Sequence, residues 1–175
     1  MKLTPVVQRF ILHWGEMGTR WGINRTVAQI HALLYISPDP LAAEEIAETL
    51  AVARSNVSNS LRELQAWGIV SVVHLLGDRR DHFASLKDVW EMFRIVVRER
   101  KRREIDPTLT VLRQCVVESG KSGTGDSGTK ARLQEMLNFF ESMTAFYDQV
   151  SRIPTGSVIK LIKMGDRLRR FMETK

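Results

Sequence analysis

Apolar side chains recur through most of this chain at the three- and four-residue spacing of amphipathic helices. Thr4 followed by Pro5 predicts the start of a first helix, and Asn24 predicts the cap of a second one. The apolar positions of these helices are Phe10, Ile11, Trp14, Val27, Ile30, Leu33 and Leu34. Three glycines are expected to loosen the chain between them, namely Gly15, Gly18 and Gly22. The prolines in the segment 37–40 end the second helix, because proline cannot continue it.

The pattern from residue 43 to residue 67 predicts two short helices joined by a tight turn. The first helix runs from Ala43 to Leu50, the segment 51–53 forms the turn, and the second helix runs from Arg54 to Trp67. Gly68 terminates the second helix. The positions expected to face inward are Ile46, Ala47, Leu50, Val57, Leu61 and Leu64.

The next segment predicts a β-hairpin that pairs residues 69–76 with residues 81–86. Gly77 and Asp78 supply the turn, so that Arg79 and Arg80 project from the tip of the hairpin. An arginine at such a tip can enter a narrow minor groove, where the negative potential of DNA is enhanced. The alternative is that both arginines are ordinary exposed turn residues, with Arg80 paired to Asp78 inside the hairpin.

The remainder of the chain is predicted to be helical with two interruptions. Asp88 caps a long helix, and Asp106-Pro107 is expected to break or sharply kink it and to start a new helix. The segment 119–129 is rich in Gly, Ser and Thr and is expected to be a mobile loop. Four helices are expected in all. The apolar positions are Val89, Phe93, Val96 and Val97 in the first and Leu109, Leu112 and Val116 in the second. They are Leu133, Met136, Leu137, Phe140 and Tyr147 in the third, and Val158, Leu161, Ile162 and Leu168 in the fourth.

Polar side chains line the outer face of the helix predicted from residue 54. Ser55, Ser58, Asn59 and Arg62 follow the spacing i, i+3, i+4, i+7, and Arg54 and Asn56 flank them near the helix start. A major groove admits one α-helix, and its base edges offer partners to Asn, Arg and Ser. A polar stripe alone is more often a solvated helix face. The tight turn before it and the basic hairpin after it together favour DNA binding.

Composition limits the other classes of function. The 175 residues are 43% hydrophobic and 26% charged, which is typical of a globular protein, and the net charge of +6 favours polyanionic partners. The single cysteine, Cys115, excludes an internal disulfide and is expected to be a buried, inert thiol rather than a redox sensor. We expect a cytoplasmic protein with no membrane segment and no signal peptide. The four histidines lack metal-ligand spacing, and no catalytic motif is present, so we expect neither a metal, a cofactor nor an enzyme.

Several short motifs in combination resemble the multiple-antibiotic-resistance regulator (MarR) family, and in particular its glycine-betaine-synthesis repressor-like (GbsR-like) branch. The matching segments are 10–18, 21–22, 43–47, 54–58, 61–64, 67–68, 77–80, 88–93 and 98–107. The resemblance implies a mainly α fold with a small β-hairpin wing, that is, a winged helix–turn–helix with N- and C-terminal dimerisation helices. It also implies a homodimer and, usually, repression that a small ligand relieves. The residues expected to contact DNA are Arg54, Ser55, Asn56, Ser58, Asn59, Arg62, Arg79 and Arg80.

Two positions depart from the family pattern. Ala42 and Ala53 precede the two motif helices, where relatives commonly have Ser or Thr. The loss of such a cap costs about 1 kcal/mol, so we expect the fold to survive. Ala53 cannot offer a hydroxyl to a phosphate, which puts one backbone contact in doubt.

Three predictions concern dimerisation and sensing. The apolar stripes around Phe10, Phe140 and Leu161 favour a dimer over an intramolecular bundle, and two recognition helices about 34–36 Å apart suit a palindromic operator. The basic run 98–103 either contacts phosphates or forms the solvated side of a helix, and the sequence does not separate the two. Five aromatic side chains are candidates for an effector pocket that holds a quaternary ammonium, although aromatics at helical spacing are more often core. They are Trp14, Trp21, Tyr35, Trp67 and Trp90.

The sequence therefore predicts three regions. Residues 1–36 form helices for dimerisation and support, residues 37–87 form the DNA-binding domain, and residues 88–175 form a helical dimerisation region. The predicted function is sequence-specific, ligand-responsive regulation of transcription through double-stranded DNA. The alternative is a winged-helix module that binds another protein without specific DNA binding.

Overall fold

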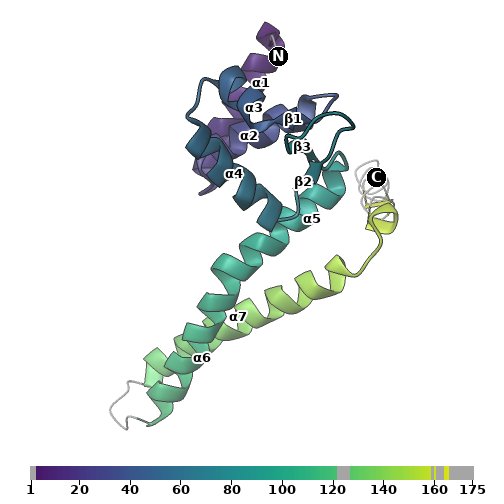
Figure 1. The fold of residues 1–175 in the computed structure, drawn as a ribbon. Coiled ribbons are helices and arrows are strands. Elements are labelled where there is room, and N and C mark those ends of the chain that lie inside the picture. Colours follow the sequence, from purple (N-terminus) through teal and green to yellow (C-terminus); the bar gives the residue numbers. More distant parts are fainter. Residues whose placement is uncertain (1–2, 122–126, 159, 161–163, 166–175) are drawn as a thin grey trace. The chain divides into compact units, whose positions relative to one another are not determined.

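The computed structural model of the protein describes residues 3–121, 127–158, 160 and 164–165, in two compact units formed by residues 1–95 and 96–175 (Figure 1). The elements of the first unit are α1 (Pro5–Arg20), α2 (Arg25–Ile36), β1 (Leu41–Ala42), α3 (Ala43–Leu50), α4 (Arg54–Ala66), β2 (Val70–Val73), β3 (His82–Ser85) and the beginning of α5 (Val89–Arg100). The second unit holds the end of α5, then η1 (Lys101–Ile105), α6 (Asp106–Lys121) and α7 (Ser127–Ser151).

Helices α1 and α2 begin where the sequence predicts. The Thr4 side chain accepts a hydrogen bond from the backbone of Val7, and the Asn24 side chain accepts one from Thr26. Both caps satisfy backbone N–H groups that the first helical turn would otherwise leave unpaired.

The prediction that Gly15 and Gly18 loosen the chain is wrong, because both are buried inside α1. A Cβ atom at Gly18 would lie 2.5 Å from the Ala28 Cβ of α2, and one at Gly15 would lie 2.6 Å from the Gln29 Cγ. These glycines therefore allow two helix backbones to approach closely. Gly22, at φ +73°, is the glycine of the three that occupies the turn.

The two motif helices are confirmed: α3 has the predicted bounds, and α4 ends one residue early, at Ala66. Ala51 ends α3 in the left-handed conformation, with φ 53°, and the Val52 backbone N–H donates to the Ala47 carbonyl oxygen. This tight turn carries the chain directly into α4. The core that α2, α3, α4 and the sheet share contains Ile30, Leu33, Leu34, Ile46, Val57, Leu61, Leu64, Val70 and Phe83.

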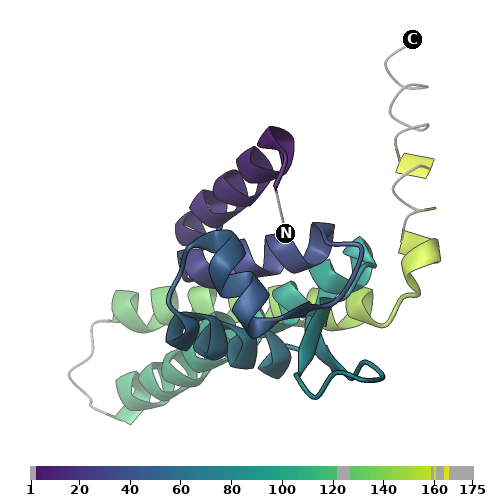
Figure 2. The ribbon, with the colours of Figure 1, turned by 45° about the horizontal axis from the view of Figure 1, so that its top comes forward.

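The hairpin is confirmed, although its paired strands are shorter than the predicted 69–76 and 81–86, and it belongs to a three-stranded antiparallel sheet with the strand order β1-β3-β2. Strand β1 was not predicted. Leu41 pairs with Phe83, and Phe83 pairs with Val72 on its other side. A two-residue strand shows no alternation of its own, and its partner lies about forty residues further along the chain. Figure 2 shows the β2–β3 loop extending from the end of this sheet.

Lys87, which follows β3, forms hydrogen bonds with the C-terminal end of α2. Its Nζ atom donates to the backbone oxygens of Leu34 at 2.9 Å, Tyr35 at 2.7 Å and Ser37 at 2.7 Å. The last carbonyls of a helix have no partner within the helix and carry a partial negative charge, so an ammonium group suits them. This cap was not predicted from the sequence.

Asp88 caps α5 as predicted, since its Oδ1 accepts from the backbone N–H groups of Trp90 at 2.8 Å and Glu91 at 3.0 Å. The apolar positions that the sequence lists for α5 are not its buried face. Val89 is 57% exposed and Phe93 59% exposed, whereas Met92 and Ile95 are the buried side chains. Apolar residues cover more than half of the circumference of this helix, so periodicity alone did not select its buried face.

A break at Asp106-Pro107 does not occur, because α5, η1 and α6 follow one another without a non-helical residue. Helix α6 begins at Asp106, where the sequence predicts the start of a new helix. The Asp106 backbone N–H donates to the Lys101 carbonyl oxygen, five residues back, which is the hydrogen bond of a π turn. The wider turn accommodates the proline ring without ending the helix. Asp106 does not cap a new helix, and its carboxylate accepts a hydrogen bond from the Lys101 Nζ at 2.8 Å.

Helices α6 and α7 form an antiparallel pair within the second unit (Figure 1). Leu109 and Leu112 of α6 bury against Leu137 of α7, and Arg113 forms an ion pair with Glu141 at 2.9 Å. The loop predicted at 119–129 is shorter than expected, because residues 119–121 end α6 and residues 127–129 begin α7. The middle of that loop and most of the last predicted helix, with Leu161, Ile162 and Leu168, lie outside the described residues.

Candidate nucleic-acid interface

Helix α4 buries one face and exposes the other. Val57, Ser60, Leu61 and Leu64 are buried in the core. On the opposite face Arg54, Ser55, Asn56, Asn59 and Arg62 are exposed, and Ser58 is half-buried. The structure thus brings together, on one open surface, all six α4 residues that the sequence singled out. Whether they contact DNA stays a prediction.

The two arginines of this surface are held by neighbouring side chains. The Arg54 Nη2 lies 2.5 Å from the Glu44 Oε1 of α3, which ties the start of α4 to the preceding helix. Arg62 donates to the side-chain oxygen of Asn59, one helical turn back. The Asn59 oxygen is therefore occupied while its NH₂ group keeps both donors. The exposed face thus offers the NH₂ group of Asn59 and the remaining N–H groups of Arg62 as hydrogen-bond donors.

The first turn of α4 carries no side-chain cap, because Ala53 stands at the cap position. The N–H groups of a first turn point outward and favour anions such as phosphate. The missing hydroxyl at Ala53 therefore removes one possible phosphate contact, whereas the backbone N–H donors of the turn remain. At α3 the other departure is partly compensated, because the Ala42 backbone N–H donates to the Glu45 carboxylate at 2.7 Å.

The wing loop between β2 and β3 has one clamped and one free arginine. The Arg80 guanidinium donates to both Asp78 oxygens, with Nη2–Oδ2 at 2.6 Å and Nε–Oδ1 at 3.1 Å. Hydrogen bonds from Arg80 lower the pKa of Asp78 to about 2. Within the described residues Arg79 has no ion pair and is exposed. The intra-hairpin pairing that the sequence left open is therefore present for Arg80 and not for Arg79.

His82 lies against both residues of this clamp. It is buried, its Nδ1 lies 3.1 Å from the Arg80 carbonyl oxygen, and its Nε2 lies 3.5 Å from the Asp78 Oδ2. The loop also exposes Leu76 completely, which the sequence did not signal. The wing therefore presents a fixed acidic–basic clamp beside a free arginine and a free leucine.

A cavity of about 180 Å³ lies in the first unit, lined by Phe10, Trp14, His31, Ala32, Tyr35, Val89 and Met92. Of the five aromatic side chains proposed for an effector pocket, Trp14 and Tyr35 line this cavity, whereas Trp21, Trp67 and Trp90 do not. Trp21 lies edge-on to Trp14, with ring centroids 6.2 Å apart. The sequence did not point to His31, because a single histidine on an apolar helix face is ordinarily part of the core.

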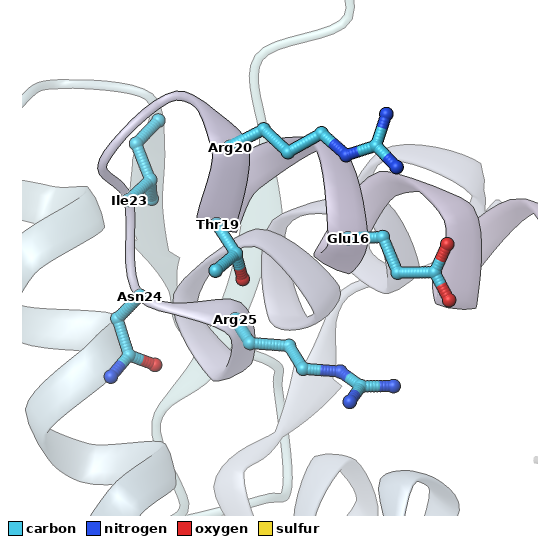
Figure 3. A pocket seen from close by; sticks show the side chains of 6 residues that line it. All are labelled: Glu16, Thr19, Arg20, Ile23, Asn24 and Arg25. Atoms are coloured by element: carbon cyan, nitrogen blue, oxygen red, sulfur yellow. The ribbon is translucent and has the colours of Figure 1, made fainter.

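An open depression at the α1–α2 turn is lined by Glu16, Thr19, Arg20, Ile23, Asn24 and Arg25 (Figure 3). The side chains of Arg20, Arg25 and Glu16 extend to the same side, so positive and negative groups occur together there. The depression contains no buried polar group in need of a partner, and we assign it no ligand.

The basic run 98–103 is partly neutralised by its own acidic neighbours. Arg102 lies 2.5 Å from Glu99, and Arg100 lies 3.7 Å from Glu104. These pairs fit the solvated helix side better than a phosphate-binding patch. Cys115 is half-buried rather than fully buried. Over the part of the chain that the structure describes, no cluster of three metal-binding side chains occurs and no helix could span a membrane.

Comparison with known proteins finds a family to which the middle of this chain is similar. Residues 21–81, which include α2, both motif helices and most of the wing, match the MarR family. It is 24% identical over 149 residues to the HTH-type transcriptional repressor GbsR of Bacillus subtilis (strain 168), a match that covers 81% of this chain and 82% of the relative. This similarity agrees with the GbsR-like branch suggested by the sequence motifs.

A solved structure agrees in fold. The crystal structure of a transcriptional regulator superposes with a TM-score of 0.66 at 21% identity, covering 84% of this chain and 96% of that chain. The mainly helical architecture with a small sheet, predicted from the sequence as a winged helix–turn–helix, is thereby confirmed.

Proposed function

We propose that this chain is a MarR-type regulator that acts on transcription by binding a specific sequence of double-stranded DNA, and that it acts as a repressor. The exposed polar face of α4 carries the proposal. Asn59 and Arg62 offer the hydrogen-bond donors that recognise base edges in the major groove, and Ser55 and Asn56 lie beside the uncapped first turn, where a phosphate would bind. Arg79 would enter the adjoining minor groove, because no carboxylate of the described residues holds it.

We also propose that the chain acts as a homodimer. Helix α7 packs on α6 through Leu133, Leu137 and Phe140, yet Phe139 is 62% exposed and Phe146 67% exposed. Large apolar side chains exposed along one helix are costly in water and mark interaction surfaces. A symmetric dimer would cover them and would set two α4 helices on a palindromic site.

The dimer proposal has a direct test. Phe139→Ser combined with Phe146→Ser is expected to convert the dimer to a monomer, as measured by light scattering after gel filtration. Ser142→Ala changes an exposed polar residue of the same helix and serves as the control. A wild-type chain that is monomeric at micromolar concentration would refute the dimer, as would a double variant that stays dimeric.

The regulator is proposed to respond to a small effector that binds in the cavity beside Trp14 and Tyr35. Binding at that place would act on α1, α2 and the start of α5, and so on the support of the recognition helix. No catalytic step is required by this function.

Selection of duplexes from a random DNA pool tests the proposal. We expect the selected fragments to share a palindrome whose half-sites are about one helical turn apart. The affinity for this palindrome should exceed that for scrambled DNA by at least about 10³-fold at physiological salt. Recovery of no common sequence would refute specific DNA binding.

A protein-binding module is the second candidate, and the ion pairs favour it. Arg54 and Arg80 are already paired with Glu44 and Asp78, so they are less available to phosphates than free arginines would be. Such a module would bind selected and scrambled DNA equally at every salt concentration, which separates it from the regulator.

A further inference from the structure

The tip of the wing loop is a tight turn with a leucine at its apex. The Asp78 backbone N–H donates to the Leu75 carbonyl oxygen at 3.1 Å, which closes a β-turn whose two central residues are Leu76 and Gly77. The φ of Gly77 is +84°, whereas the φ of Leu76 is not positive, as in a type II turn. Leu76 therefore occupies the first corner of the turn, on the loop that extends from the end of the sheet (Figure 2).

The fold gives Leu76 no apolar surroundings. Its side chain is completely exposed, and the neighbouring Leu75 is 41% exposed. A leucine side chain is more stable away from water. A type II turn restricts only its second central position to glycine, so the turn would form equally well with a polar residue in place of Leu76. Folding alone therefore does not explain the leucine.

The hydrogen bonds that follow the turn hold Leu76 on a fixed support. The Asp78 carboxylate accepts a hydrogen bond from the Arg80 backbone N–H at 2.9 Å, in addition to those from the Arg80 guanidinium. The buried His82 lies against the same two residues. A loop that is already ordered loses little conformational freedom on binding, so Leu76 is suited to insertion into a narrow space.

Two classes of partner fit this tip poorly. The segment 74–81 contains two acidic and two basic residues, so its charge gives no attraction to an anionic membrane surface. Leucine is under-represented among the residues that dominate protein–protein binding, and two adjacent leucines form a much smaller patch than a stable protein interface needs.

The neighbours of Leu76 favour double-stranded DNA instead. Arg79 is exposed on the same loop, and the polar face of α4 belongs to the same compact unit. Proteins that bind the minor groove read it with arginine and frequently insert a leucine or another apolar side chain between two base pairs, which partly unstacks them and kinks the duplex. The wing presents both groups within four residues.

We propose that Leu76 is an apolar wedge that enters the minor groove beside Arg79, separates two adjacent base pairs and kinks the operator. This inference rests on the proposed binding of double-stranded DNA and adds a source of specificity that needs no hydrogen bond to a base. Pyrimidine–purine steps such as TA unstack easily. Leu76 therefore selects such a step where each wing meets the duplex.

The bend of the selected palindrome measures the action of the wedge. The full chain is bound to a duplex that carries a donor dye at one end and an acceptor dye at the other, and energy transfer between the dyes reports the bend. We expect the wild type to kink the duplex by at least about 20° at each wing. Leu76→Ala should lose most of this kink, whereas Leu76→Met should retain most of it, because methionine also serves as a wedge.

The preference for a flexible step is the second measurement. Hydroxyl-radical footprinting locates the step under each wing, and that step is changed from TA to AA. We expect the wild type to bind the TA duplex at least about 5-fold more tightly and Leu76→Ala to distinguish the two by less than about 2-fold. Leu76→Ala should keep the wild-type salt dependence, unlike Arg79→Ala, because it removes no charge. Its urea unfolding should match that of the wild type, because the side chain is exposed.

The outcomes separate this inference from the proposed function. The wedge alone is overturned by an unbent palindrome, by a kink that survives Leu76→Ala, by equal loss of the kink in Leu76→Ala and Leu76→Met, or by equal wild-type affinity for TA and AA. If the wild type selects no common sequence, the proposed function fails and the bend is measured on a scrambled duplex. A kink there that depends on Leu76 supports the wedge, and a straight duplex overturns it. A chain that binds no DNA overturns both.

Discussion

The contact between α1 and α2 predicts opposite outcomes for two glycine-to-alanine changes in the same helix. At Gly18 a new Cβ would lie 2.5 Å from the Ala28 Cβ, about 1 Å or more inside an ordinary carbon–carbon contact of about 3.5–4.0 Å. Both atoms are fixed to helix backbones, so α1 must move away from α2. At Gly15 the new Cβ would meet the Gln29 Cγ at 2.6 Å, and that side chain is flexible and only half-buried.

The expected magnitudes follow from two opposing effects. Alanine is favoured over glycine inside a helix by about 1 kcal/mol. Overpacking a tight contact costs about 1–3 kcal/mol. Gly18→Ala should therefore lower the free energy of unfolding by up to about 2 kcal/mol, since the overpacking cost exceeds the helix gain. Gly15→Ala should leave it unchanged or raise it by up to about 1 kcal/mol, because Gln29 can turn aside.

Urea unfolding followed by circular dichroism at one protein concentration measures both variants. Ala28→Gly in the Gly18→Ala background should recover part of the loss, and the double-mutant cycle should give a coupling energy clearly different from zero. Equal stabilities of Gly15→Ala and Gly18→Ala, or the reverse order, would refute the close approach of α1 and α2.

Three further outcomes are expected. Lys87→Met should lower the free energy of unfolding by about 2–3 kcal/mol in urea melts. The C-terminal carbonyls of α2 would lose a charged donor, while the apolar part of the side chain is kept. An unchanged free energy of unfolding would contradict the cap. Arg79→Ala should reduce the slope of log affinity against log salt concentration by about 2 per dimer. Arg80→Ala should weaken DNA binding further, because it leaves the Asp78 carboxylate unpaired beside DNA. Identical effects of the two changes would argue against the clamp. Acidification should destabilise the wild type, since burial and the nearby charge of Lys87 lower the folded pKa of His31 to about 4, below its unfolded value of 6.5. Between pH 6.5 and pH 4 the unfolded state binds a proton at His31 that the folded state does not bind. The free energy of unfolding therefore falls by up to about 3 kcal/mol as the pH drops from 6.5 to 4. Urea melts at pH 7 and pH 4.5 should show a smaller difference for His31→Leu than for the wild type.

The helix–turn–helix could be predicted from the sequence because its determinants are local. The apolar positions of α3 and α4 recur at helical spacing within a few residues, and Gly68 marks the end of the second helix. The polar positions of α4 then follow from the same periodicity. Periodicity alone therefore places the candidate residues of α4 away from its buried face.

The features that the sequence did not reveal depend on distant partners. Strand β1 forms only because Leu41 meets Phe83, and Lys87 becomes a helix cap only because folding brings it to residues about fifty positions earlier. Neither contact leaves a periodic signal. Gly18 was misread for the same reason, since a glycine that loosens a chain and one that admits a neighbouring helix look alike until the neighbour is known.

Pro107 shows a different limit. The rule that proline ends a helix assumes the α-helical hydrogen-bond register, and the π turn at Lys101–Ile105 changes that register before the proline is reached. The cavity of the first unit could not be predicted either, because its lining residues His31, Trp14 and Val89 come from three separate helices.

The central claim is that the exposed face of α4 recognises base edges. The decisive measurement is the ratio of affinities for the selected palindrome and for a scrambled duplex, by fluorescence anisotropy at physiological salt. Asn59→Ala combined with Arg62→Ala should lower this ratio by at least about 100-fold, since each base contact contributes about 1–3 kcal/mol of discrimination in each half-site. Arg9→Ala, which removes an exposed arginine of α1, should leave it unchanged. A double variant that folds and keeps the wild-type ratio would contradict the claim.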